Sequence, residues 1–83
     1  MSSKYDPLGN HLSKLRIDKW RASFEDIEDI LGFRLPFSAY KHSAWWANEK
    51  HPKTHVQKKV WQSAGWGTEG LNKEARTVTF IRR

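Results

Sequence analysis

The chain contains no cysteine, and for a chain of 83 residues this feature most restricts how it can fold. Neither a disulfide bond nor a thiolate metal site can stabilise it. A domain of this size buries only about 60% of the surface that its unfolded chain exposes, so its hydrophobic core is thin. Stability must therefore come from large side chains, and the chain supplies five tryptophans and four phenylalanines.

The lack of cysteine is also typical of proteins in a reducing compartment. No apolar run approaches the roughly 18 residues that a membrane span needs, and the N-terminus lacks the apolar stretch of a secretion signal. We therefore expect a cytoplasmic protein that makes no contact with a membrane.

Charge is distributed unevenly along the sequence. Fifteen Lys and Arg against nine Asp and Glu give a formal net charge of +6 and a pI near 9.9. Four of the acids lie within residues 24–31, which hold no base, so the rest of the chain carries fifteen positive charges against five negative. A field of that sign attracts phosphates. The alternative is a basic surface that only keeps a small protein soluble.

The N-terminal part has a helical pattern followed by an extended one. Leu8, Leu12 and Leu15 have helical spacing, and the preceding Asp6 and Pro7 predict an N-cap and a first helical position. Residues 19–24 then alternate, which predicts a short half-buried strand. Its apolar side is Trp20, Ala22 and Phe24, and its polar side is Lys19, Arg21 and Ser23.

A clear helix follows this strand. Ser23 and Asp26 have the spacing of a helix cap, and Gly32 predicts a left-handed stop. One apolar stripe connects them, made by Phe24, Ile27, Ile30 and Leu31. The four acids lie in or near the first two turns, where the helix dipole favours negative charge, so their role is interpreted as structural.

Further elements are predicted after Gly32. Pro36 opens a short helix to about Lys41, and residues 41–53 are loop-like. Residues 54–64 predict a helix in which Thr54 and Gln57 form a capping box. Its apolar positions are Val56, Val60, Trp61 and Ala64, and its opposite face offers the long donors Gln57, Lys58, Lys59 and Gln62.

The C-terminal part predicts a β-hairpin, with strands at residues 66–71 and 77–81 joined by residues 72–76. The fold class is therefore α+β, with three to four short helices and a small antiparallel sheet made of this hairpin and a short strand near residues 19–23. We expect a flexible N-terminus at residues 1–4 and a single domain over residues 5–83.

The chain also resembles, over about residues 5–83, a small, largely uncharacterised bacterial and phage domain family, and residues 24–66 and 77–83 carry the shared pattern. The shared pattern is F-x-x-I-E-x-I-L-G-x-x-L-P-x-S-A, then W-W-x-N, then H-x-x-Q-x-x-W-x-x-A-G-W, and finally V-x-F-x-R. The positions that carry it include Phe24, Glu28, Gly32, Pro36, Trp45, Trp46, Asn48, Trp61, Trp66, Val78, Phe80 and Arg82. The family histidine corresponds to His51 or His55. The resemblance implies a fold and no activity.

The order of helices, strand and hairpin is similar to that of a winged helix, in which one helix enters the DNA major groove. On this interpretation, residues 54–64 form the reading helix. Gln57 and Gln62 would contact adenine edges, and Lys58 and Lys59 would contact phosphates or guanine. Flanking phosphates would be bound by Lys73, Arg76, Arg82 and Arg83. The alternative is a helix face that is merely solvated.

The tryptophans have two possible roles. Trp61 and Trp66 occupy core positions of their elements. If residues 45 and 46 are extended, one of their two rings points outward, and Trp46 beside Asn48, Lys50 and Lys53 would form a stacking platform for single strands. Alternatively, both rings cover the thin core.

No catalytic or metal-binding pattern is evident, so we expect neither an enzyme nor a cofactor. His51 and His55 are four residues apart, but Pro52 interrupts any helix between them, and no cysteine completes a tetrahedral site. Two functional hypotheses remain. The first is a nucleic-acid-binding module, with DNA favoured. The second is a protein-binding module or inhibitor that docks on an acidic, nucleic-acid-handling enzyme of a phage or defence system.

Overall fold

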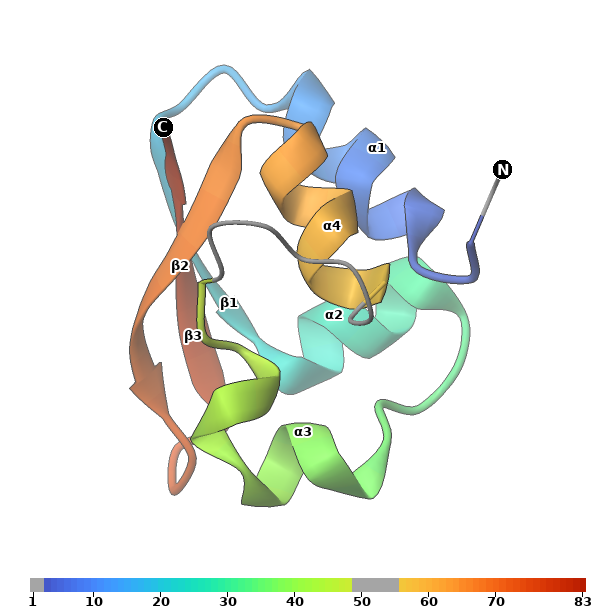
Figure 1. The fold of residues 1–83 in the computed structure, drawn as a ribbon, viewed down its shortest axis with the longest axis vertical. Coiled ribbons are helices and arrows are strands. Elements are labelled where there is room, and N and C mark those ends of the chain that lie inside the picture. The colour runs from blue at the N-terminus through green and yellow to red at the C-terminus, as the bar shows by residue number, and fades with distance from the viewer. Residues whose placement is uncertain (1–2, 49–55) are drawn as a thin grey trace.

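The computed structural model describes residues 3–48 and 56–83. Its elements confirm the α+β class (Figure 1). In chain order they are α1 (Asp6–Lys14), β1 (Lys19–Ser23), α2 (Phe24–Leu31), α3 (Phe37–Lys41), the short 3₁₀ helix η1 (Ser43–Trp45), α4 (Val56–Ser63), β2 (Trp66–Asn72) and β3 (Thr77–Arg82). None of the described helices is long and apolar enough to cross a membrane.

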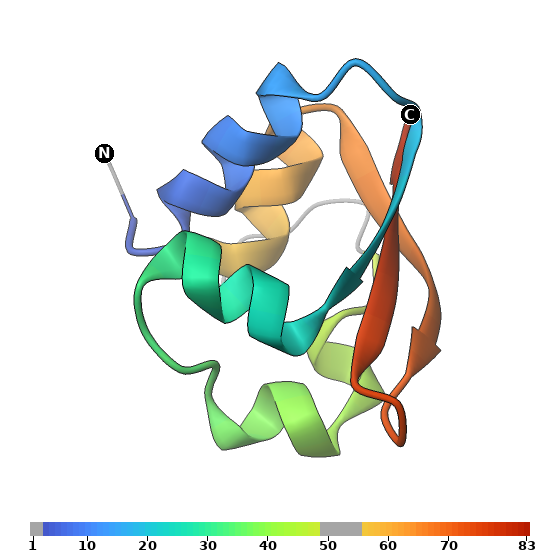
Figure 2. The ribbon, with the colours of Figure 1, turned by 180° about the vertical axis from the view of Figure 1, so that it is seen from behind.

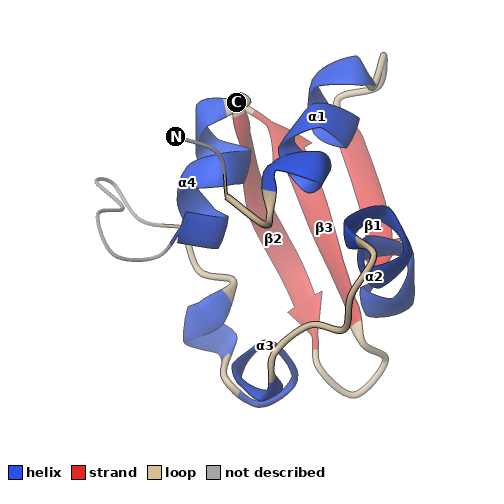
Figure 3. Ribbon diagram, turned by 90° about the vertical axis from the view of Figure 1, so that its right-hand side faces the viewer, coloured by secondary structure: helices blue, strands red, loops and turns tan. Residues whose placement is uncertain are grey.

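The three strands form one antiparallel sheet in the order β1-β3-β2, so β3 is central and both other strands are edges. The predicted hairpin and the predicted strand near residues 19–23 therefore join into a single sheet. The helices lie on one side of this sheet, as Figure 1 and the opposite view in Figure 2 both show. No described helix covers its other side, and Figure 3 shows the strands behind α1, α2 and α4.

The core lies between the sheet and the helices and consists mainly of aromatic rings. Trp46 stacks on Phe24 with ring centroids 4.9 Å apart, and it also stacks on Trp61 with centroids 5.9 Å apart. Phe80 from β3 contacts Trp61 edge-on at 5.6 Å. Trp46, Trp61 and Trp66 are all buried. Aromatic mass therefore fills the core of this small domain, as the composition predicts.

The ends of α2 follow the sequence prediction closely. The Ser23 hydroxyl accepts a hydrogen bond from the Asp26 amide at 2.9 Å, and the Asp26 carboxylate accepts one from the Ser23 amide at 3.3 Å. Gly32 ends the helix with a φ of 83°, in the left-handed region that glycine adopts most easily. A capping box and a glycine stop are local signals, so they can be read from sequence.

Asp6 is not the N-cap that the sequence predicts. Helix α1 begins at Asp6 itself, with Tyr5 in the cap position. The Asp6 carboxylate instead accepts hydrogen bonds from the Ser3 amide at 3.0 Å and from the Ser3 hydroxyl at 3.1 Å. The acid therefore holds the segment that enters the helix, and its charge lies in the first turn, where the helix dipole favours it.

Candidate nucleic-acid interface

The predicted reading helix does not present the side chains that were expected to read DNA. Gln57 is only 5% exposed and donates a hydrogen bond to the Trp45 carbonyl at 3.3 Å, and Lys58 is only 3% exposed. The exposed positions of α4 are Val56, Lys59 and Ser63. The interpretation of Gln57 and Lys58 as base-reading residues is therefore wrong.

The reason is the way in which α4 packs. It contacts α1 on one side and β2 on another, and Gln57 reaches the 3₁₀ segment through Trp45. A helix enclosed from several directions buries more than its apolar stripe, and long polar side chains then lie against neighbouring elements. Val56, which was predicted to lie on the apolar face, is exposed instead. The predicted start of this helix, at Thr54, lies outside the described residues.

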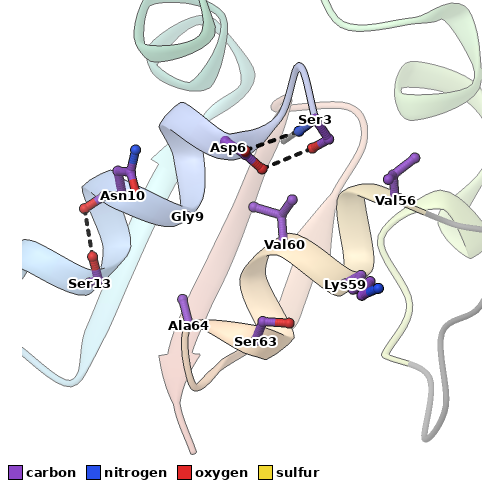
Figure 4. A pocket seen from close by; sticks show the side chains of 10 residues that line it. All are labelled: Ser3, Asp6, Gly9, Asn10, Ser13, Val56, Lys59, Val60, Ser63 and Ala64. Atoms are coloured by element: carbon purple, nitrogen blue, oxygen red, sulfur yellow. Dashed lines mark hydrogen bonds between the residues drawn. The ribbon is translucent and has the colours of Figure 1, made fainter. Parts of the chain in front are cut away.

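The exposed side of α4 is the wall of a groove (Figure 4). This groove has a volume of about 540 Å³ and lies between α4 and α1. The two helices approach closely at Gly9, where an added Cβ would lie 2.8 Å from Cγ1 of Val60. Among the described residues that line this groove, Lys59 is the only cation. Gln62 is half-buried, so a row of long donors along α4 is not present.

The stacking platform predicted at Trp46 is also wrong. Trp46 is 1% exposed, and its indole nitrogen donates a hydrogen bond to the Ala39 carbonyl at 2.7 Å. Trp45 is half-buried, and its ring contacts Trp46 at 4.6 Å and Tyr5 at 5.9 Å. An exposed ring would require an extended segment, whereas Trp45 ends the 3₁₀ helix η1, so both rings turn toward the core.

Asn48 has a structural partner in β2. Its Oδ1 accepts a hydrogen bond from the Thr68 amide at 2.8 Å, and its Nδ2 donates one to the Thr68 carbonyl at 2.8 Å. The Thr68 hydroxyl donates to the Trp46 carbonyl at 2.5 Å. The Trp-Trp-x-Asn sequence therefore has a role in folding: Trp46 fills the core and Asn48 covers the edge of β2.

The remaining predicted cations do not converge on one site. Lys73 donates to the Lys41 carbonyl at 3.3 Å, and the Arg76 guanidinium lies 5.3 Å from the centre of the Tyr40 ring. These residues belong to the turn between β2 and β3, whereas Arg82 lies at the other end of β3, roughly 20 Å away at strand spacing. Lys50 and Lys53 lie outside the described residues.

Arg82 is engaged within the protein. One guanidinium nitrogen donates to the carbonyls of Leu15 at 2.7 Å and Ile17 at 3.1 Å, and Nε pairs with Asp18 at 3.0 Å. The guanidinium also lies 4.6 Å from the centre of the Trp66 ring. Arg82 therefore fixes the connection between α1 and β1, and few of its donors remain for a phosphate.

On the uncovered side of the sheet, the structure places Arg83, one of the predicted phosphate-binding cations, with two cations of β1 that were not predicted. Trp20 and Ala22 of β1 face the helices, so the alternating Lys19 and Arg21 face the other way. The Arg83 side chain crosses the same side, because it lies directly over Gly67 and leaves no room for a Cβ there. We call Lys19, Arg21 and Arg83 the basic face.

An acid of β2 lies across the sheet from these cations. Glu69 on β2 pairs with Lys19 at 3.3 Å, and both side chains are largely solvated. Such a pair contributes about 0–1 kcal/mol, so an incoming phosphate can displace the carboxylate at little cost. The sequence signal for this face was the polar side of the strand at residues 19–24. Its extension to Arg83 depends on the register between β1, β3 and β2.

The acidic residues of α2 lie apart from the basic face and partly serve the fold. Glu28 Oε2 accepts hydrogen bonds from the Leu35 amide at 2.8 Å and the Tyr40 hydroxyl at 2.5 Å. Burial raises the pKa of Tyr40, and the neighbouring Glu28 carboxylate raises it further. Residues 3–48 and 56–83 contain no group of three His, Asp or Glu side chains that could hold a metal.

The fold and this surface define an α+β domain whose sheet has one basic side that no described helix covers. Residues 5–83 match the family described as "Domain of unknown function (DUF7662)", and the chain belongs to this family. No curated protein and no solved structure matches the chain. The expectation of a small uncharacterised domain family is therefore confirmed, and the winged-helix comparison is not.

Proposed function

We propose that the protein is a nucleic-acid-binding module that contacts phosphates through the basic face. The observation that carries the proposal is the presence of Lys19, Arg21 and Arg83 on the side of the sheet that no described helix covers. A flat sheet surface can lie along a nucleic-acid backbone without entering a groove. DNA remains the favoured partner, and we propose that the module binds without catalysing a reaction.

This function differs in mechanism from groove reading. The described exposed residues include neither a stacked indole platform nor a row of amide donors along α4. Phosphate contacts carry no sequence information by themselves. We therefore expect similar affinity for unrelated sequences of equal length, with binding that depends strongly on salt.

Fluorescence anisotropy with labelled random duplex DNA, single-stranded DNA and RNA tests the proposal. If the three cations each neutralise one phosphate, the slope of log affinity against log salt on duplex DNA is about −2.7. Neutralising all three by Lys19→Ala, Arg21→Ala and Arg83→Ala should bring that slope close to zero. The matched control is the triple variant Lys41→Ala, Lys59→Ala and Lys73→Ala, which removes three exposed cations elsewhere.

The control should bind with the slope of the natural sequence. The proposal is wrong if the basic-face variant keeps its affinity and slope while the control loses both. Circular dichroism on each triple variant establishes that folding is intact, since all six side chains are exposed.

The second hypothesis, a protein-binding module, loses its expected hot spot because Trp46 is buried. Its best remaining apolar feature is Phe37, at the start of α3, which is 73% exposed. A single exposed ring is common on protein surfaces and does not define an interface. The edge of β1 gives a stronger reason to consider a protein partner.

A further inference from the structure

The two edges of the sheet differ in whether their outward backbone groups have hydrogen-bond partners among the described residues. In β2, the ladder to β3 uses the backbone groups of Gly67 and Glu69, so the Thr68 amide and carbonyl point to the outer edge. Asn48 satisfies both, with each hydrogen bond at 2.8 Å. A side chain thus takes the place of a neighbouring strand, and this edge is closed to further pairing at Thr68.

No described residue covers the edge of β1 in this way. Asp18 accepts a hydrogen bond from the Arg82 amide, and the Phe24 amide donates to Arg76, both at 2.8 Å. In an antiparallel pair, alternate residues bond to the neighbouring strand. Because Asp18 and Phe24 bond at the two ends of β3, the backbone groups of Lys19 and Arg21 point away from it. Neither residue has a backbone hydrogen bond to another described residue on that side. The β1 edge therefore presents two amides and two carbonyls.

We propose that this edge accepts an extended acidic segment of a partner protein, which adds a fourth strand antiparallel to β1. Backbone hydrogen bonds to Lys19 and Arg21 would supply the pairing, as in other cases of strand addition. Residues directly opposite Lys19 and Arg21 share their side of the sheet, so acidic side chains at those positions would face two cations.

The other side of the added strand would meet apolar surface. Trp20, on the helix side of β1, is half-buried and stacks on Phe80 with ring centroids 5.8 Å apart. Alternate residues of the incoming segment would pack beside the Trp20 ring. The preferred segment therefore alternates acidic and apolar residues, because one side of β1 is cationic and the other is apolar.

A second copy of the chain is a poor occupant of this edge. Pairing β1 with another β1 would set Lys19 and Arg21 against the same two cations, and like charges opposite one another destabilise a sheet. Edge lysines commonly prevent such self-pairing. The inference goes beyond nucleic-acid binding, although an added acidic strand would use two cations of the basic face and would compete with phosphates.

The test uses the full chain labelled with ¹⁵N and a capped peptide of alternating glutamate and valine. Binding is measured by nuclear magnetic resonance, together with the exchange rates of individual amides. We expect the Lys19 and Arg21 amides to exchange at least about tenfold more slowly with saturating peptide, because a hydrogen bond worth about 1.4 kcal/mol corresponds to a factor of 10.

Two N-methylated peptides provide matched controls. In an antiparallel pairing, the glutamate amides would bond to β1 and the valine amides would face solvent. Methylation of the glutamate amides should therefore weaken binding at least about tenfold relative to methylation of the valine amides. Equal binding of both peptides, or no slowing of exchange at Lys19 and Arg21, would show that no strand is added.

The outcome is independent of the proposed function. Oligonucleotides bound through side chains should shift resonances of the basic face without protecting the two amides. Salt-dependent oligonucleotide binding can thus persist when the peptide test fails, and the peptide can bind when the oligonucleotide test fails.

Discussion

Asn48 is exposed by area, and yet both ends of its amide are committed to the backbone of Thr68. In the sequence, Asn48 follows two tryptophans in a loop-like segment. Neither that position nor its exposed area indicates that the side chain completes a sheet edge. Asn48 supplies the donor and the acceptor that the Thr68 backbone would otherwise lack.

We predict that Asn48→Ala lowers the free energy of unfolding by about 1–3 kcal/mol, because the Thr68 amide and carbonyl lose their partners. Urea unfolding followed by tryptophan fluorescence measures this change. Asn10→Ala is the control, since Asn10 is an exposed asparagine within α1. A loss for Asn48→Ala no larger than that for the control would contradict the assigned role.

At the scale of elements, α1 and α4 pack closely because Gly9 has no side chain. Alanine normally favours a helix over glycine by about 1 kcal/mol, so Gly9→Ala would be stabilising on propensity alone. Here the added Cβ would lie 2.8 Å from Val60 Cγ1, and a β-branched side chain in a helix has little freedom to move away.

We therefore predict that Gly9→Ala destabilises the protein, by about 1–3 kcal/mol as is typical of overpacking. Thermal unfolding of Gly9→Ala and of the double variant Gly9→Ala/Val60→Ala distinguishes the two effects. The second change should restore part of the lost stability by removing the clash. A higher melting temperature for Gly9→Ala alone would show that Val60 leaves room for a Cβ at position 9.

Local signals in the sequence predicted most elements, and the contacts between elements explain what it missed. Ser23, Asp26 and Gly32 define α2 because a cap and a stop involve only nearby residues. The exposed side of α4 could not be predicted from Gln57 and Lys58, since their burial depends on which elements surround that helix. The basic face needs strand register, which places Arg83 on the same side of the sheet as Lys19 and Arg21, far away in sequence.

Helices α2 and α3 are linked by the hydrogen bond from Tyr40 to Glu28, and the raised pKa of Tyr40 makes this link sensitive to alkaline pH. Folding favours the neutral phenol. Its contribution to stability is therefore complete below the pKa of an unfolded tyrosine, near 10, and is lost as the pH rises through the higher pKa of the folded state.

We predict that the stability difference between the natural protein and Tyr40→Phe is constant at neutral pH and shrinks above about pH 10. Urea unfolding across a series of pH values measures this difference. Both proteins share the other titrating groups, including Tyr5, whose pKa is raised by burial. A difference that does not vary between pH 8 and pH 12, roughly one unit or more on either side of the tyrosine pKa, would argue against the link.

At the scale of the whole molecule, the connection between α1 and β1 is held against the C-terminal strand at one end of the sheet. Residues from the connection before β1 meet the last strand there, and Figure 2 shows that connection beside the C-terminus. Arg82 makes the contact through Leu15, Ile17 and Asp18, over sequence separations of 64 to 67 residues. Its distance from the turn at Arg76 is the reason that the predicted phosphate site does not assemble.

The roles of Arg82 and Arg83 can be separated by replacing each with lysine, which keeps the charge and removes the planar set of donors. Arg82→Lys should lower the free energy of unfolding by about 1–3 kcal/mol, because two carbonyls lose a donor and the contact with Trp66 weakens. Arg83→Lys should change stability by less than about 0.5 kcal/mol, as is usual for an exposed position. Oligonucleotide binding should show the reverse sensitivity: Arg83→Ala reduces the magnitude of the salt slope by about 0.9, whereas Arg82→Ala, measured where it remains folded, leaves the slope unchanged. Equal effects of the two arginines on both measurements would contradict both the contacts of Arg82 with the α1–β1 connection and the place of Arg83 in the basic face.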